Sequence, residues 1–325
     1  MTYQDSPDSI NFQSRAVASV AVLAGATCLS MSAILVKLAG VDAATTAMLR
    51  CAIAVVVLIP LALGERGRRG PLSRRGISSA LAAGVALGID YAAWTASIYH
   101  VGAGISTVVV NVQVVVLPLL AFAVDRERIR LRFLLALPLM LLGISLVAGI
   151  WDAATLRQEA AMSGTLLGLL AGLGYGAYLF LTRRATRQEP GRTVQPLAWA
   201  TTSAAVTATL IAPFTGGLHL KAITPLAWTY LIMLAVLGQI VAWLLIHHGS
   251  IRLEPVTTAA LLLIQPVLAL GLSAMILAEH PTKLQLAGAS IVIAAVAVSN
   301  GLFDKRRRTT GRSSRPATTL KNRKC

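Results

Sequence analysis

Charged and aromatic side chains are both scarce in this chain of 325 residues, at 13% and 5%. Hydrophobic residues make up 56%, and the mean hydropathy is +0.71. A soluble protein of this length cannot bury so many apolar side chains in its core. The composition therefore excludes a soluble protein. Three cysteines and five histidines provide neither a disulfide framework nor the spacing of a metal site. The sequence therefore predicts no metal and no cofactor.

Between the clusters of charge lie apolar runs of about 20 residues, the length that crosses a bilayer core. They predict an all-α integral membrane protein with ten transmembrane helices. We expect these helices at residues 16–40, 43–64, 76–99, 104–124, 131–150, 163–183, 194–214, 224–247, 254–278 and 283–302.

The two halves of this profile resemble each other. Residues 98–147 align without a gap on residues 250–299, which places Gln113 on Gln265. Because five crossings are an odd number, a second half related to the first is inverted in the membrane. The sequence predicts a first five-helix repeat at residues 1–150, a second at residues 151–302, and a basic, disordered cytoplasmic tail at residues 303–325.

The basic residues predict the orientation. With the N-terminus inside, 24 of the 29 Lys and Arg residues fall in inside segments, nine of them in the tail, and three fall outside. This strong positive-inside pattern predicts a protein of the cytoplasmic (inner) membrane with both termini in the cytoplasm. We expect the tail to lie near anionic lipid. Nucleic acid binding is not expected, because no aromatic residues are interleaved with the basic ones.

Two local patterns predict how helices begin and pack. Thr282 followed three residues later by Gln285 is a capping box, which starts a helix. Glycine recurs at every fourth position from residue 164 to residue 176, along one stripe of the sixth span. Small residues let helix backbones approach closely in lipid, so we expect this stripe to be a packing face.

This organisation resembles the drug/metabolite transporter superfamily, and most closely its EamA-type branch. The second half carries the better match to the family pattern, in Gln265-Pro266, Ala278-Glu279-His280, Gln285 and Gly288. Arg50 in the second span matches an arginine that is common in the family. The first half departs from the pattern, because Val114 stands at the place of Pro266 and Ala136 at that of Gly288.

The resemblance implies a secondary transporter, not an enzyme, that exports small metabolites such as amino acids by alternating access through a central cavity between the two repeats. Efflux of hydrophobic or cationic drugs is the alternative. An intramembrane enzyme is a distant third interpretation, since its site needs paired acids, a nucleophile with a base, or metal ligands. A channel is disfavoured because no ring of charge or filter-like repeat is present. The sequence leaves the oligomeric state open, with a monomer favoured.

Asp90 is the one acidic residue well inside a span. A charge at that depth costs ~3 kcal/mol or more and normally faces the bundle interior or a water-filled cavity. Three interpretations stay open: contact with a substrate ammonium group, proton carriage, and a structural pair with Arg50. Both residues lie roughly 12–13 Å from the outer ends of their spans, so they can pair if the helices are adjacent. Together they could also hold both ends of a zwitterion.

Further polar and aromatic residues are candidates to line the cavity. Trp94 lies four residues after Asp90 and shares its helix face, and Gln239, Trp243 and His247 form a matching stripe in the eighth span, so we expect the two halves to meet there. Simple packing is the alternative for the aromatic residues, and helix–helix hydrogen bonding for the amides. The predicted substrate-binding residues are Asp90, Tyr91, Trp94, Asn111, Gln113, Tyr175, Tyr178, Gln239, Trp243 and Gln265.

Overall fold

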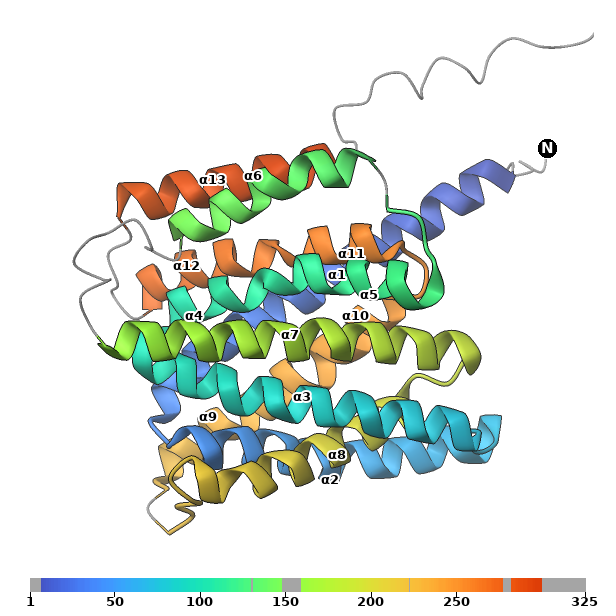
Figure 1. Ribbon diagram of the computed structural model, residues 1–325. Helices are drawn as coiled ribbons and strands as arrows, with labels where there is room; N and C mark the ends of the chain where they lie inside the picture. The colour runs from blue at the N-terminus through green and yellow to red at the C-terminus, as the bar shows by residue number, and fades with distance from the viewer. Residues whose placement is uncertain (1–6, 130, 148–158, 222, 277–281, 300–325) are drawn as a thin grey trace, which may run out of the picture.

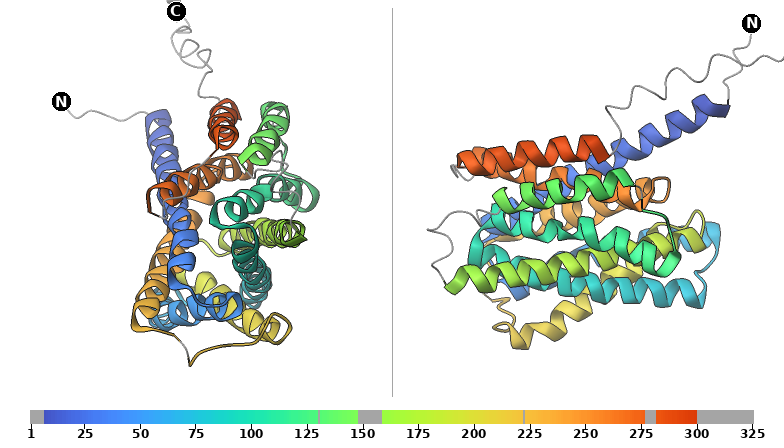
Figure 2. Two further views of the ribbon diagram at one scale, coloured as in Figure 1. Left: turned by 90° about the vertical axis from the view of Figure 1, so that its left-hand side faces the viewer. Right: turned by 45° about the horizontal axis from the view of Figure 1, so that its top comes forward.

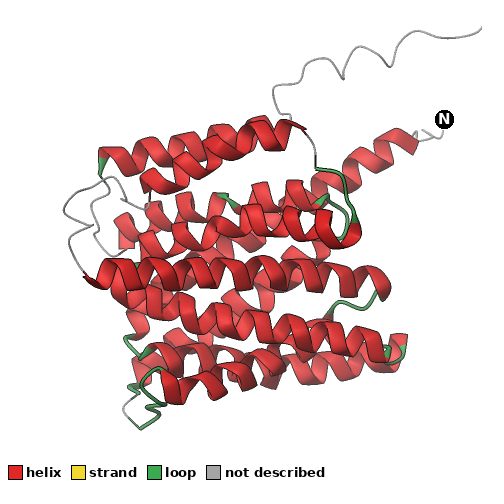
Figure 3. Cartoon of the chain, viewed as in Figure 1, coloured by secondary structure: helices red, strands yellow, loops and turns green. Residues whose placement is uncertain are grey.

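The structure is a computed structural model, and it describes residues 7–129, 131–147, 159–221, 223–276 and 282–299. Within these ranges every regular element is a helix and no strand is present (Figure 1 and Figure 3). Most elements are α-helices, joined by two short 3-10 segments and one π-helix. The predicted all-α class is confirmed.

Successive helices run back and forth along one common axis (Figure 1). The first half contains α1 (Pro7–Ala39), α2 (Ala43–Arg69), α3 (Arg74–Val101), α4 (Ala103–Val109), the 3-10 segment η1 (Val110–Val112), α5 (Gln113–Asp125) and α6 (Leu131–Val147). The second half contains α7 (Glu159–Gln188), α8 (Val194–Ile211), the 3-10 segment η3 (Ala212–Phe214), α9 (Pro225–Met233), the π-helix η4 (Leu234–Val241), α10 (Ala242–Ser250), α11 (Pro255–Leu262), α12 (Ile264–Ile276) and α13 (Lys283–Ser299). The start of α1 and the end of α13 lie at the same end of the bundle, on the right of Figure 1.

The helices identify a multi-pass membrane protein by their length and composition. Seven helical spans in the described part of the chain are long and apolar enough to cross a membrane. Three more apolar helices, Val110–Asp125, Leu131–Leu146 and Lys283–Ser299, are shorter. Ten crossings with cytoplasmic termini therefore stay a prediction. The predicted basic tail and the Ala278-Glu279-His280 motif lie outside the described residues.

The two halves of the chain are interleaved. α1, the first helix of the first half, packs on α10 and α12 of the second half. α7, the first helix of the second half, packs on α3 and α5 of the first. α6 and α13 pair with each other at one edge of the bundle (Figure 2). Corresponding helices thus have corresponding partners in the other half, as two related repeats around a shared core would have.

Glycine permits the close approach of α7 to the first half. A Cβ atom added to Gly168 would lie 2.9 Å from the Val109 side chain, and one added to Gly176 would lie 2.6 Å from that of Val116. Real Cβ atoms essentially never come that close to a neighbour. The glycine stripe of the sixth span is therefore a packing face, as predicted.

Capping groups define where helices start. The predicted capping box is present before α13: the Thr282 N–H donates to Gln285 Oε1 (2.8 Å), and the Gln285 N–H donates to Thr282 Oγ1 (3.3 Å). At the start of α2, the Thr45 N–H donates to Asp42 Oδ1 (2.9 Å). These bonds satisfy N–H groups that have no partner within their own helix.

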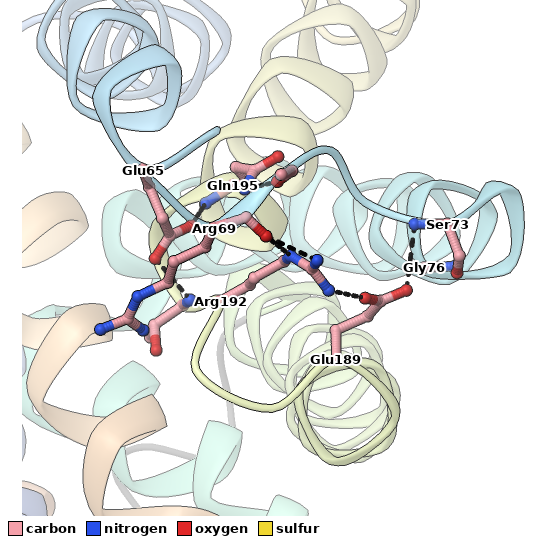
Figure 4. A network of polar contacts seen from close by, with 9 residues as sticks. Glu65, Arg69, Ser73, Gly76, Glu189, Arg192 and Gln195 are labelled. Carbon is pink, nitrogen blue, oxygen red and sulfur yellow. Dashed lines mark hydrogen bonds and ion pairs between the residues drawn. The ribbon is translucent and has the colours of Figure 1, made fainter. Parts of the chain in front are cut away.

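At the end of the bundle where α2 and α7 finish, the two halves cap each other's helices (Figure 4). The carboxylate of Glu65 in α2 accepts hydrogen bonds from three N–H groups at the start of α8, those of Thr193 (2.9 Å), Val194 (3.2 Å) and Gln195 (2.8 Å). In return, the Gln195 amide donates to the Gly70 carbonyl oxygen at the end of α2 (3.1 Å). Each half thus supplies the partners that a helix end of the other half lacks.

Glu189 and Arg192 extend this contact to α3. Arg192 donates to the Arg69 carbonyl oxygen through Nε (3.1 Å) and Nη2 (2.6 Å), and to Glu189 through Nη1 (2.5 Å). The N–H of Ser73, the N-cap of α3, donates to the other Glu189 oxygen (3.0 Å). Hydrogen bonding from Ser73, helped by the positive charge of Arg192, holds the pKa of Glu189 below its ordinary value. We call the set the capping junction: Glu65, Arg69, Ser73, Glu189, Arg192 and Gln195.

Candidate functional site

A cavity with an empty volume of about 390 Å³ lies between the two halves, away from the capping junction. It is lined by Leu29 and Ser32 of α1, Arg50 of α2, Asp90, Tyr91 and Trp94 of α3, Thr107 of α4, Val110 of η1, Tyr175 of α7, Trp243 of α10 and Gln265 of α12. Both halves therefore contribute to its wall. Of the residues predicted to bind substrate, the wall includes Asp90, Tyr91, Trp94, Tyr175, Trp243 and Gln265.

Arg50 is the more deeply buried of the two charges on this wall, with 1% of its surface exposed. Its guanidinium lies over the Tyr91 ring, with Cζ 3.7 Å from the ring centroid, a cation–π contact. Nη2 donates to the Gly238 carbonyl oxygen (3.2 Å). Nε and Nη1 are buried and have no hydrogen-bond partner among the described residues. A buried cation with two unsatisfied donors favours an anionic group beside it.

Asp90 faces the same cavity and is 4% exposed. α7 approaches closely here because Gly174 has no side chain: a Cβ atom added to it would lie 3.2 Å from that of Asp90. The Asp90 carboxylate makes neither a hydrogen bond nor an ion pair within 4.0 Å with any residue that the structure describes. The direct pair with Arg50, one of the three interpretations of Asp90, is therefore absent. The two opposite charges face one cavity separately.

The π-helix η4 interrupts the eighth span next to Arg50. At its end the Ala242 N–H donates to the carbonyl oxygen of Leu237, five residues back. Such turns are rare inside α-helices and concentrate at functional sites. η4 presents the Gly238 carbonyl oxygen to Arg50, and a Cβ atom added to Gly238 would lie 2.3 Å from Ser32 Oγ and 3.2 Å from Arg50 Nη2. The absence of a side chain at residue 238 therefore leaves room for the guanidinium.

The Tyr91 hydroxyl joins the third and eighth spans. It donates to Gln239 Oε1 (2.5 Å) and accepts from the Trp243 indole N–H (2.7 Å). The Gln239 amide donates in turn to Thr201 of α8 (3.1 Å), and all four side chains are buried. Such a satisfied buried network holds its members in one arrangement. The two predicted stripes do meet, but through Tyr91, while Asp90 and Trp94 face the cavity.

An aromatic layer lies on one side of the cavity. The Tyr178 and Trp243 rings meet edge to face with centroids 4.5 Å apart, and the Tyr178 hydroxyl lies 3.3 Å from His247 Nε2. The Tyr175 hydroxyl accepts from the Gln265 amide (2.9 Å). Tyr178 follows the lining residue Tyr175 along α7, and His247 follows the lining residue Trp243 along α10. Both helices run toward the end that carries the capping junction (Figure 1). The layer of Tyr178, Trp243 and His247 therefore separates the cavity from that end.

Asn111 and Gln113 are buried but do not line the cavity. The Asn111 amide donates to the Thr107 carbonyl oxygen of its own span (2.5 Å), and neither polar atom of the Gln113 amide has a partner among the described residues. The 3-10 segment η1 lies at this point and winds more tightly than an α-helix, which turns the following side chains. Tyr178 and Gln239 are likewise absent from the cavity wall, because they form the layer and the network described above.

Four lining residues were not predicted from the sequence, namely Leu29, Ser32, Thr107 and Val110. The hydroxyls of Ser32 and Thr107 within apolar spans are the one signal that could have indicated them. No group of three His, Cys, Asp or Glu side chains in the described ranges is placed to hold a metal ion. The polar lining, one cation, one carboxylate and neutral donors, suits an organic ligand.

Comparison with known proteins agrees with this architecture. A solved crystal structure of a protein is similar over 90% of this chain and 99% of its own, with a TM-score of 0.69, and at 17% identity it shows the fold alone. None of the curated proteins matches the sequence significantly. The model of the EamA-like transporter family matches twice, over residues 17–149 and 162–301. Because these two matches span most of the chain, the resemblance inferred from the sequence is confirmed, and the chain belongs to the EamA-like transporter family.

Proposed function

We propose that this protein is a secondary transporter of the cytoplasmic membrane that exports small zwitterionic metabolites, such as amino acids, by alternating access. The observation that carries this proposal is the presence of Arg50 and Asp90 on one cavity wall without a bond between them. The family supplies the transporter function, and the two charges point to the cargo.

An unpaired charge inside a membrane protein is costly, by ~3 kcal/mol or more for each residue. Such residues are retained where a ligand, water or another charge supplies the missing partner. A zwitterion supplies both partners at once. Its carboxylate can accept from Nε and Nη1 of Arg50, and its ammonium group can donate to Asp90.

The remaining wall fits the apolar part of a small molecule. The rings of Trp94, Tyr175 and Trp243 provide apolar surface, and the Trp94 indole N–H is a buried donor without a partner among the described residues. These donors and rings favour a compact substrate with one apolar side.

Alternating access is supported by the interleaved halves and by closure at one end. The layer of Tyr178, Trp243 and His247, followed by the capping junction, lies between the cavity and the end that charge predicts to be cytoplasmic. Export by rocking of two repeats requires this layer to open for loading and to close before release on the other side.

Counterflow in liposomes tests the proposal. The probes are a labelled panel of neutral L-amino acids, the same compounds as carboxamides, and the same compounds as N-acetyl derivatives. We expect saturable exchange of free amino acids, with at least about tenfold loss for either derivative, because each removes one charge–charge contact. Arg50→Gln and Asp90→Asn should each abolish exchange, with Asp125→Asn as the control. Equal transport of amino acids and their carboxamides would contradict the role given to Arg50.

Export of hydrophobic cations is the second candidate, and the rings of Trp94 and Trp243 beside Asp90 favour it. Ethidium efflux from cells that overproduce the protein separates the two candidates. Under this alternative Asp90→Asn removes efflux while Arg50→Gln preserves it. Under the zwitterion proposal overproduction leaves ethidium efflux unchanged.

A further inference from the structure

A groove on the outside of the bundle lies where α2, α3 and α8 meet. Its empty volume is about 880 Å³. α2, the turn after it, the start of α3 and α8 all contribute to its walls, which include Ile59, Leu63 and Arg66 of α2 and Gln195 and Trp199 of α8. Ile59, Leu63 and Trp199 have 46%, 59% and 43% of their surface exposed, so this is a surface groove.

The groove changes in polarity along its length. α2 ends and α8 begins at the capping junction, so Arg66 and Gln195 lie at the end of the groove near that junction. Ile59 lies seven residues before Arg66, or roughly 10 Å deeper along the helix at 1.5 Å per residue. The wall is thus charged and polar at one end and apolar over about the length of the first part of an acyl chain.

The charged end carries positive charge that the protein does not neutralise. The side chain of exposed Arg66 makes no hydrogen bond or ion pair with any described residue. Residues 65–77 contain five arginines and one acid, Glu65, whose oxygens are occupied by the N–H groups of α8. Glu189, the acid of the adjacent turn, is held by Ser73 and Arg192. The electrostatics therefore favour an anion at Arg66.

We propose that this groove binds an anionic phospholipid, with its phosphate group on Arg66 and an acyl chain along Ile59, Leu63 and Trp199. A basic pocket between membrane helices, with apolar walls that continue into the bilayer, matches both parts of such a lipid. Trp199 suits this boundary, because indole rings prefer the membrane interface. A free anion in water would use the charge and leave the apolar walls uncovered.

Lipid in the groove acts on the capping junction. Gln195 lines the groove and also donates to the Gly70 carbonyl oxygen, while its N–H donates to Glu65. A lipid in the groove packs on both α2 and α8 and therefore holds them together at the end where both halves are capped. Bound anionic lipid should raise the thermal stability of the protein.

Native mass spectrometry and thermal melting of the full-length protein test the proposal, with dioleoyl phosphatidylglycerol and dioleoyl phosphatidylcholine as probes. We expect phosphatidylglycerol to bind the wild type about tenfold more tightly than phosphatidylcholine, which corresponds to ~1.4 kcal/mol. Arg66→Gln should abolish this preference and the associated gain in melting temperature. Arg68→Gln is the matched control, because Arg68 is also exposed but does not line the groove, and it should preserve both.

Trp199→Ala probes the apolar wall, and we expect it to weaken the binding of both lipids while the preference between them persists. Equal losses in Arg66→Gln and Arg68→Gln would show general attraction to a basic surface and would overturn the proposal. Equal binding of the two lipids to the wild type would show an apolar groove without a headgroup site and would overturn it as well. Each variant changes an exposed side chain, so we expect folding to be retained.

Discussion

Replacing Glu65 with glutamine tests how much the capping junction contributes to stability. The carboxylate accepts three backbone N–H bonds at the start of α8, two through Oε1 and one through Oε2. In Glu65→Gln one oxygen becomes an NH₂ group, which cannot accept and would face an N–H donor. The negative charge that favours a helix N-terminus is also lost.

The magnitude follows from these two losses. Removing an N-terminal cap costs about 0.5–2 kcal/mol, and the charge at the helix end adds about 0.3–1 kcal/mol. We therefore expect Glu65→Gln to reduce stability by about 1–3 kcal/mol. Asp125→Asn is the matched control, because Asp125 pairs with Arg184 at 3.6 Å at an exposed position, and such pairs contribute about 0–1 kcal/mol.

Two measurements on purified protein distinguish these outcomes. The apparent melting temperature should fall more in Glu65→Gln than in Asp125→Asn. Hydrogen exchange followed by mass spectrometry should show faster exchange at the start of α8, near residues 193–200, because frayed N–H groups exchange with water. Equal melting temperatures of the two variants, or unchanged exchange in that segment, would refute the assignment of Glu65 as a cap between the halves.

Three further predictions concern the cavity and the junction. Gly238→Ala places a methyl group 2.3 Å from Ser32 Oγ and 3.2 Å from Arg50 Nη2, so both of these cavity side chains must shift. We therefore expect the KM of exchange for a transported zwitterion to rise about tenfold with little change in kcat, and a kcat effect alone would contradict this. Tyr91→Phe removes a hydroxyl that bonds to two buried partners, so the free energy of unfolding should fall by about 1–3 kcal/mol, measured by thermal unfolding. An unchanged stability would show that the network is dispensable. Because the pKa of Glu189 lies below its ordinary value of 4.5, its ionised form stabilises the protein fully above that pH and loses this contribution as the pH falls through the folded-state pKa. The difference in melting temperature between wild type and Glu189→Gln should therefore be constant near neutral pH and shrink below about pH 4.5, and a difference that grows on acidification would contradict the sign.

For the charged residues of the cavity, the sequence predicts depth in the membrane but not the direction of the side chains. Depth along a span is readable from position, and it correctly places Arg50 and Asp90 near one cavity. Depth does not say which way a side chain points around the helix axis. Arg50 turns to Tyr91 and to the Gly238 carbonyl oxygen, and Asp90 faces the cavity with no hydrogen bond or ion pair to a described residue.

Irregular helical turns explain the other differences between the predicted and the observed cavity wall. Successive side chains of an α-helix turn by about 100°, so a tighter or wider turn re-aims every residue that follows. The 3-10 segment η1 separates Gln113 from the cavity wall that Gln265 reaches, although the two align in sequence. The π-helix η4 presents Gly238 to Arg50, and no residue pattern in Leu234–Val241 predicts it.

The sequence by itself determined the membrane class, the approximate position of each apolar span, the capping box before α13, the packing role of the glycine stripe and the family. These properties depend on composition, on spacing and on bonds between near neighbours, all of which are present in the chain before it folds. The tertiary structure alone decided which polar groups share a cavity and which satisfy each other. That outcome depends on the rotation of each helix and on the partner it packs against, because a buried donor bonds to whatever acceptor the neighbouring helix presents. For this reason Arg50 and Asp90 face one cavity without a direct bond between them, and the proposed transport function rests on that arrangement.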